Sequence, residues 1–148
     1  MARIDFAFGA SDRLRAACDA AYKHYRKGGR LVVYCTDQTL LERFDLMLWG
    51  FEATAFVPHV LADDALAPQT PVWLSSKPIQ PPAGPGPAVW LLNLDEDCAP
   101  GVEHYERVLE IVPQDEASVQ AGRERWRQYK SQGHDLHAHD LSRAAAGR

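Results

Sequence analysis

The first 50 residues alternate between strand and helix patterns, and this alternation limits the possible folds more than any other feature of the chain. Residues 3–8 predict a strand, and Ser11 is the candidate N-cap of the helix that follows. The apolar side chains of this helix recur at helical spacing at Leu14, Ala17, Cys18, Ala21 and Tyr25. Glycines at positions 28 and 29 end the helix.

A second strand and helix follow directly. The apolar run LVVYC within residues 30–35 predicts a strand that is buried on both faces. Thr36 or Asp37 then caps a helix whose apolar positions are Leu40, Leu41, Phe44 and Leu48. This order of elements is typical of an α/β domain, in which helices cover both faces of a mostly parallel sheet, and we expect that fold class here.

The later elements are shorter and are separated by loops. Four further strands are predicted over residues 53–57, 72–74, 89–94 and 107–112. Pro113 connects the last of these strands to a helix over residues 115–132, which Gly133 ends.

A proline-rich segment over residues 77–87 lies between two of the predicted strands. Its sequence, KPIQPPAGPGP, cannot form a helix or a central strand, because proline fixes φ and has no backbone N–H to donate. We expect an exposed connector within a single domain of residues 1–133, since neither side alone supplies a complete sheet. Residues 134–148 predict a loosely held C-terminal tail.

The overall composition is that of an ordinary globular protein. The chain has 148 residues, of which 46% are hydrophobic, and a formal net charge of −4. Its three cysteines have no CxxC spacing, which favours reduced thiols over a disulfide framework or a zinc knuckle. The N-terminus lacks a signal-peptide pattern, and no uncharged apolar run approaches about 20 residues. We therefore expect a cytoplasmic protein without a membrane partner.

Positive charge collects near the C-terminus of this acidic chain. Residues 123–148 contain six Lys or Arg against three Asp or Glu. On a helical wheel the cations form one stripe of Arg123, Arg127 and Lys130, with Val119 and Trp126 along its edge. Such a stripe can bind an acidic peptide with an apolar end, or the phosphates and bases of single-stranded DNA. The alternative is a solvated basic face with Trp126 in the core.

Catalytic motifs are missing from the places where this fold class carries them. Residues 89–97 resemble the acid-ended strand of P-loop enzymes, but no GxxxxGK[ST] motif accompanies them, so Asp95 is better explained as a turn cap. The first strand–helix turn also lacks the GxGxxG glycines. Cys35 ends a strand, and a packed thiol is its preferred interpretation. We predict no catalytic residue and no cofactor; an enzyme that uses Cys35 and Asp95 is the competing hypothesis.

Three histidines near the C-terminus have spacing that could coordinate a metal ion. They are His134, His137 and His139, and Asp140 follows them. The segment is terminal and no second cluster of ligands supports it, so we predict no metal site.

Two large apolar side chains, Trp49 and Phe56, lie in or next to segments with many apolar residues. Both could belong to the core, which periodicity alone favours. If they instead meet at the sheet edge, they form a patch with Pro58 that suits a partner helix or loop.

Four segments together resemble the chi subunit of bacterial DNA polymerase III holoenzyme over nearly the whole chain. They are LWGFEATAFVPHVL, TPVWL, WLLNLDED and VLEIVPQDEASVQAGRERWRQYKSQGHDL, of which FVPH and EIVPQDE with RERWRQYKSQG are the most specific. The resemblance implies a Rossmann-like three-layer α/β fold without a nucleotide-binding motif, and a non-catalytic accessory subunit in DNA replication. It also implies a 1:1 heterodimer with the psi subunit of the clamp-loader complex.

The resemblance further implies binding to the acidic C-terminal tail of single-stranded DNA-binding protein (SSB), with nucleic acid contacted mainly indirectly. Carried over by position, the tail site comprises Val112, Arg123, Trp126, Arg127 and Lys130, and Val119 adds to its apolar part. The psi-facing surface comprises Trp49, Phe56, Val57 and Pro58. Better-known members carry a lysine near Ser118 and Val119, so we expect weaker or rearranged tail binding there. Direct binding of single-stranded nucleic acid by the same helix is the alternative function.

Overall fold

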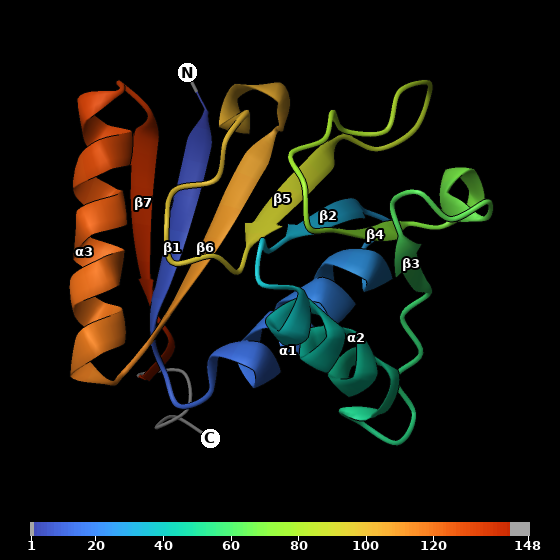
Figure 1. Ribbon diagram of the computed structural model, residues 1–148, viewed down its shortest axis with the longest axis horizontal. Helices are drawn as coiled ribbons and strands as arrows, with labels where there is room; N and C mark the ends of the chain where they lie inside the picture. The colour runs from blue at the N-terminus through green and yellow to red at the C-terminus, as the bar shows by residue number, and fades with distance from the viewer. Residues whose placement is uncertain (1, 143–148) are drawn as a thin grey trace.

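The computed structural model describes residues 2–142, which fold around one seven-stranded sheet (Figure 1). The strands are β1 (Arg3–Ala10), β2 (Arg30–Tyr34), β3 (His59–Leu61), β4 (Val72–Ser75), β5 (Val89–Asn93), β6 (Arg107–Pro113) and β7 (Asp135–Asp140). Their spatial order is β3-β4-β2-β5-β6-β1-β7, and every neighbouring pair is parallel. The α-helices are α1 (Arg13–Arg26), α2 (Gln38–Gly50) and α3 (Glu116–Ser131), and short 3-10 helices occupy Ala67–Gln69 and Val102–His104.

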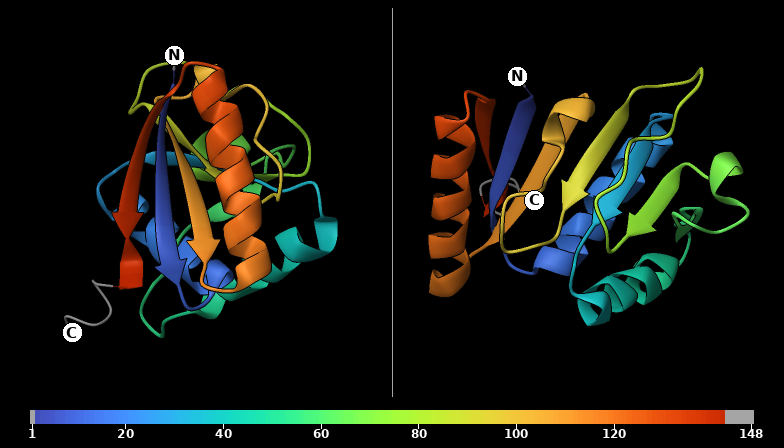
Figure 2. Two further views of the ribbon diagram at one scale, coloured as in Figure 1. Left: turned by 90° about the vertical axis from the view of Figure 1, so that its left-hand side faces the viewer. Right: turned by 45° about the horizontal axis from the view of Figure 1, so that its top comes forward.

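The helices cover both faces of the sheet, which confirms the predicted three-layer α/β fold. Helices α1 and α2 lie on one face and α3 lies on the other, over β1, β6 and β7 (Figure 2). Phe44 and Leu48 of α2 are in the core on the first face, whereas Ile4 and Tyr129 are in the core beneath α3. Within residues 2–142, no helix has the length and apolar content needed to cross a membrane.

Aspartates begin all three α-helices. The carboxylates of Asp12, Asp37 and Asp115 each accept a backbone N–H three residues further along the chain. Asp37 was one of the two predicted caps of α2. The prediction of Ser11 for α1 is wrong by one residue, because the Asp12 carboxylate accepts the N–H of Arg15.

The third strand lies further along the chain than predicted. Residues 53–57 form a turn and an irregular segment, and pairing with β4 begins only at His59, opposite Val72. Ala55 and Val57 are buried while Phe56 is exposed, so the side chains alternate as in a strand. Pro58 cannot donate a backbone hydrogen bond, and the ladder starts immediately after it.

The proline-rich segment connects two strands that both pair with β2. Residues 77–88 contain no helix or strand, as predicted. Strand β4 before the segment and strand β5 after it flank β2 on opposite sides. The segment is therefore a connector across one sheet.

The C-terminal segment is a strand where we expected a loosely held tail, so that prediction is wrong for residues 135–140. Strand β7 pairs with β1 from Arg3 opposite Asp135 to Phe8 opposite Asp140. Asp135 also donates its N–H to the Ala2 carbonyl. The strand was missed because DLHAHD is mostly polar, which suits an edge strand with one unpaired side. Residues 143–148 of the predicted tail lie outside the described part of the chain.

Candidate functional site

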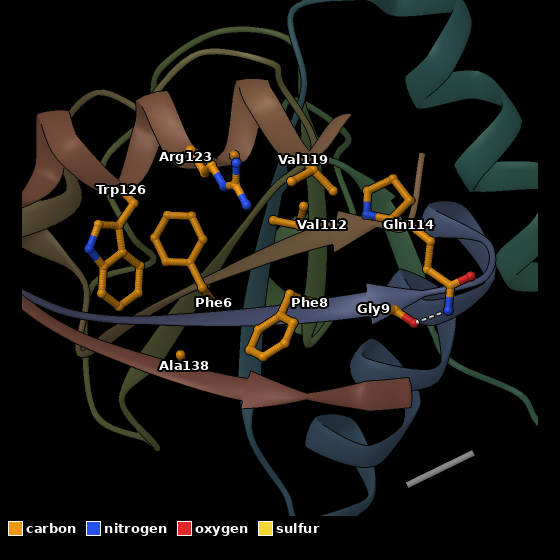
Figure 3. A pocket seen from close by; sticks show the side chains of 11 residues that line it. Phe6, Phe8, Gly9, Val112, Gln114, Val119, Arg123, Trp126 and Ala138 are labelled. Carbon is orange, nitrogen blue, oxygen red and sulfur yellow. Dashed lines mark hydrogen bonds between the residues drawn. The ribbon is translucent and has the colours of Figure 1, made fainter. Parts of the chain in front are cut away.

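A pocket of about 360 Å³ lies between α3 and the ends of β1 and β6 (Figure 3). Most of its lining is apolar, and Arg123 is the charged member. The full lining is Phe6, Phe8, Gly9, Val112, Pro113, Gln114, Val119, Gly122, Arg123, Trp126 and Ala138. A concave apolar site with a cation at its edge is suited to an apolar group that carries a negative charge.

Close packing of α3 against the sheet gives the pocket its inner wall. The ring of Trp126 meets the ring of Phe6 edge-on, with 5.1 Å between their centroids. Gly122 faces Val112, and a Cβ built at Gly122 would lie only 2.9 Å from Val112 Cγ2. Glycine at this position therefore lets the helix approach β6 closely.

The predicted tail-binding residues divide into two groups. Val112, Val119, Arg123 and Trp126 line the pocket. Arg127 and Lys130 lie outside it, exposed further along α3. Arg123, at the pocket, and the exposed Arg127 and Lys130 thus all belong to α3. Arg127 is engaged by Glu124 in an exposed ion pair with an N–O distance of 2.8 Å.

Seven of the lining residues were not predicted from the sequence: Phe6, Phe8, Gly9, Pro113, Gln114, Gly122 and Ala138. Phe6 extends from β1 toward α3, whereas the ring of Phe8 is turned toward β7, the strand that contributes Ala138 (Figure 3). The period-2 alternation of a strand places Phe6 and Phe8 on the same face, which is a signal that the sequence does contain. Ala138 could not be found in this way, because β7 itself was not predicted.

A buried polar network holds α3 in place. The Glu110 carboxylate accepts hydrogen bonds from Arg125 Nε at 2.9 Å, the Tyr129 hydroxyl at 2.8 Å and Asn93 Nδ2 at 2.7 Å. Burial raises the pKa of Glu110, while Arg125, Asn93 and Tyr129 act to lower it. All three neighbours donate, which is the arrangement that an ionised carboxylate requires. The positive charge of Arg125 therefore pairs with Glu110 inside the protein and is not exposed to a partner.

Replacing Arg125 should destabilise the fold far more than replacing a neighbouring arginine. Arg125→Met leaves the buried Glu110 charge uncompensated, which we expect to cost about 3–5 kcal/mol. Arg127→Met breaks only an exposed pair and should cost about 0–1 kcal/mol. Urea unfolding of both variants measures the difference. Equal losses would contradict the proposed role of the network.

A second exposed surface lies at the other end of the sheet. Trp49 is 51% exposed and Phe56 is 71% exposed, and Pro58 is also exposed. Val57 is fully buried in the core, so its assignment to a partner-facing surface is wrong. The side chains of this segment alternate as in a strand, so Phe56 is exposed and Val57 is buried.

His59 supports this surface from beneath. Its ring is buried and lies 4.1 Å from the Trp49 ring. Its Nδ1 is 2.7 Å from the Val57 carbonyl oxygen, and its Nε2 is 2.7 Å from Asp45 Oδ1. The histidine thus joins α2 to the loop that presents Phe56.

The residues of the competing enzyme hypothesis have structural partners. Asp95 accepts the Thr36 N–H at 2.7 Å and also the Thr36 hydroxyl, so its carboxylate joins the ends of β2 and β5 and does not cap its own turn. Burial raises the pKa of Cys35 to about 11 and that of Cys18 to about 12. Burial likewise raises the pKa of Cys98 to about 11.

These thiols should react slowly with alkylating reagents in the folded protein. Because each pKa is raised, the nucleophilic thiolate is scarce at pH 8 and becomes abundant only at strongly alkaline pH. We expect labelling by iodoacetamide at pH 8 to be at least about tenfold slower than in urea-unfolded protein. Rapid labelling of Cys35 in the folded protein would contradict this expectation.

The three C-terminal histidines have separate partners. His134 Nδ1 accepts the Ala2 N–H at 3.0 Å, His137 contacts Asp135 at 2.9 Å, and His139 contacts Asp5 at 3.1 Å. Across residues 2–142, no group of three or more His, Cys, Asp or Glu side chains is arranged to hold a metal ion.

Known proteins resemble this chain over nearly its whole length. Residues 1–137 match the family described as DNA polymerase III chi subunit, HolC. DNA polymerase III subunit chi of Pseudomonas aeruginosa is 35% identical, and the match covers 97% of this chain and 99% of that protein. The proteins of the same name from Haemophilus influenzae and Escherichia coli are each 28% identical. Those matches cover 81% and 86% of this chain, and 81% and 85% of the relatives.

Proposed function

The chain belongs to the family of the DNA polymerase III chi subunit, a replication accessory subunit, and we propose that it links the clamp-loader complex to SSB. In this proposal the psi subunit binds at one end of the sheet. The acidic C-terminal tail of SSB binds at the other end. The protein itself performs no chemistry, and its two surfaces hold the partners together.

The observation that carries the tail assignment is an apolar pocket at one end of an exposed row of cations. Val112, Val119 and Trp126 offer apolar surface to a terminal side chain. Arg123 stands at the pocket and can hold a terminal carboxylate in charge-assisted hydrogen bonds. Arg127 and Lys130 continue the row and can pair with acidic residues further back in the tail.

The same geometry is less suited to direct binding of nucleic acid. The net charge is −4, and the Arg125 cation is buried with Glu110. Affinity for single-stranded nucleic acid comes from a charged groove that follows the backbone and from stacking platforms. Three exposed cations beside one partly buried tryptophan supply little of either.

The exposed side chains of Trp49, Phe56 and Pro58 support the psi assignment. Large apolar residues that are exposed together are the usual centre of a protein–protein interface. This surface lies at the α2 and β3 end of the sheet, whereas α3 and β7 lie at the opposite end (Figure 1). The separation allows both partners to bind at the same time.

Tail binding should depend on Arg123 and on salt. A peptide with several aspartates and a terminal phenylalanine should bind the wild-type protein saturably in calorimetry, with an affinity that falls as salt rises. Arg123→Ala should weaken binding about tenfold or more, because a charge-assisted contact is lost. Arg26→Ala, which removes an exposed arginine of α1, is the matched control. Absence of wild-type binding would contradict the assignment, and tight binding of an oligonucleotide instead would favour the direct nucleic-acid function.

Psi binding should depend on the surface formed by Trp49, Phe56 and Pro58, at the α2 and β3 end of the sheet. Phe56→Ala should weaken the complex with psi by about tenfold or more, because a large exposed ring leaves the interface. The same variant should bind the tail peptide normally, and Arg123→Ala should bind psi normally. Co-purification and calorimetry with psi measure both effects. Loss of both partners in either variant would contradict the idea of two separate sites.

A further inference from the structure

The outer face of α2 carries a large apolar side chain that neither assigned surface uses. Leu46 is 73% exposed, more than any other exposed large apolar residue within residues 2–142. The side chains of α2 that are buried in the core are Leu41, Phe44 and Leu48. Leu46 is not among them, so its apolar surface meets solvent in the isolated chain.

Leu46 is a neighbour of Trp49 on the surface of the helix. Residues three apart on an α-helix lie about 60° apart around its axis, one turn along it. Both side chains are exposed, so they form one apolar strip on the outer side of α2. Glu42 and Arg43, one turn before Leu46, are also exposed and give the strip a charged border. A single exposed leucine is ordinary, whereas adjoining large apolar side chains with a polar rim are typical of an interaction surface.

His59 connects this strip to the segment that carries Phe56. The buried ring of His59 lies 4.1 Å from the Trp49 ring, and its Nε2 is 2.7 Å from Asp45 Oδ1 in the same helix. Because His59 directly follows Pro58 in the chain, these contacts fix α2 relative to the segment that presents Phe56. The strip and Phe56 therefore belong to one preformed surface.

We propose that Leu46 is a further contact of the psi surface, which it extends from Trp49 over the outer face of α2. The inference rests on the proposed psi binding and deepens it, because it names the helix face that the partner covers. The occupant is the psi subunit, which presents an apolar patch to Leu46, Trp49 and Phe56 together. Burial of Leu46 against that patch removes apolar area from water and favours the complex.

Substitutions at Leu46 test this inference by calorimetry with the psi subunit. Leu46→Ala should weaken the complex about five- to tenfold, because less apolar area is buried. Leu46→Glu should weaken it about thirtyfold or more, because a carboxylate is then placed against an apolar partner. Leu46→Met, which keeps the apolar volume, should stay within about twofold of the wild type. Leu66→Ala shortens an exposed leucine outside α2 and is the matched control, for which we expect wild-type affinity.

Two further measurements separate a contact from a structural role and from self-association. Both weakened Leu46 variants should keep the urea midpoint of the wild type and its affinity for the tail peptide, because Leu46 is exposed and lies at the end of the sheet opposite α3. Light scattering of the protein without psi should show a monomer. A wild-type dimer that Leu46→Ala dissociates would assign the strip to a second copy of the chain and overturn the inference.

Phe56→Ala is the reference that distinguishes the inference from the function on which it rests. Weakening of the psi complex by Phe56→Ala but not by Leu46→Ala would overturn the inference and leave psi binding in place. A wild-type protein that does not bind psi would overturn the function and the inference together.

Discussion

The buried ion pair between Arg125 and Glu110 is the interaction on which the candidate site depends. Removing two charges from water is costly, and here the cost is offset because Tyr129 and Asn93 also donate to the same carboxylate. The network joins α3 to β5 and β6, so the helix has a fixed position over the sheet. With α3 fixed, Gly122 can pack on Val112 and Trp126 on Phe6, and the pocket forms between them. The buried Arg125 thus positions the helix that carries Arg123 and Arg127, the arginines that we propose bind the tail.

The order of strands places the two exposed surfaces at opposite ends of one rigid sheet. The α3 end carries an apolar pocket and a row of cations, whereas the α2 and β3 end carries exposed Trp49 and Phe56. The first surface suits a charged chain end, and the second suits an apolar face of a folded or folding partner. A protein with two such unlike surfaces is suited to joining two partners, which is the role that we propose for this accessory subunit.

The fold was largely predictable because its buried strands are apolar and the apolar residues of its first two helices recur at helical spacing. The failures have physical reasons. Strand β7 is an edge strand with a polar sequence, and Val57 was assigned outward although strand-like alternation turns it inward. The burial of Arg125 was not predicted, because its partner Glu110 lies on a different element, 15 residues earlier in the chain. The α3 half of the candidate site followed from helical spacing, whereas Ala138 could not be predicted because the strand β7 that carries it was not predicted.

The most direct test of the central claim is a nuclear magnetic resonance titration that follows the indole N–H signals of the four tryptophans while the acidic, phenylalanine-ended peptide is added. Only Trp126 lines the pocket, whereas Trp49 belongs to the opposite surface. The account predicts a saturable shift of the Trp126 signal with the Trp49 signal unchanged. A shift of Trp49 instead, or no shift of Trp126 at saturation, would contradict it.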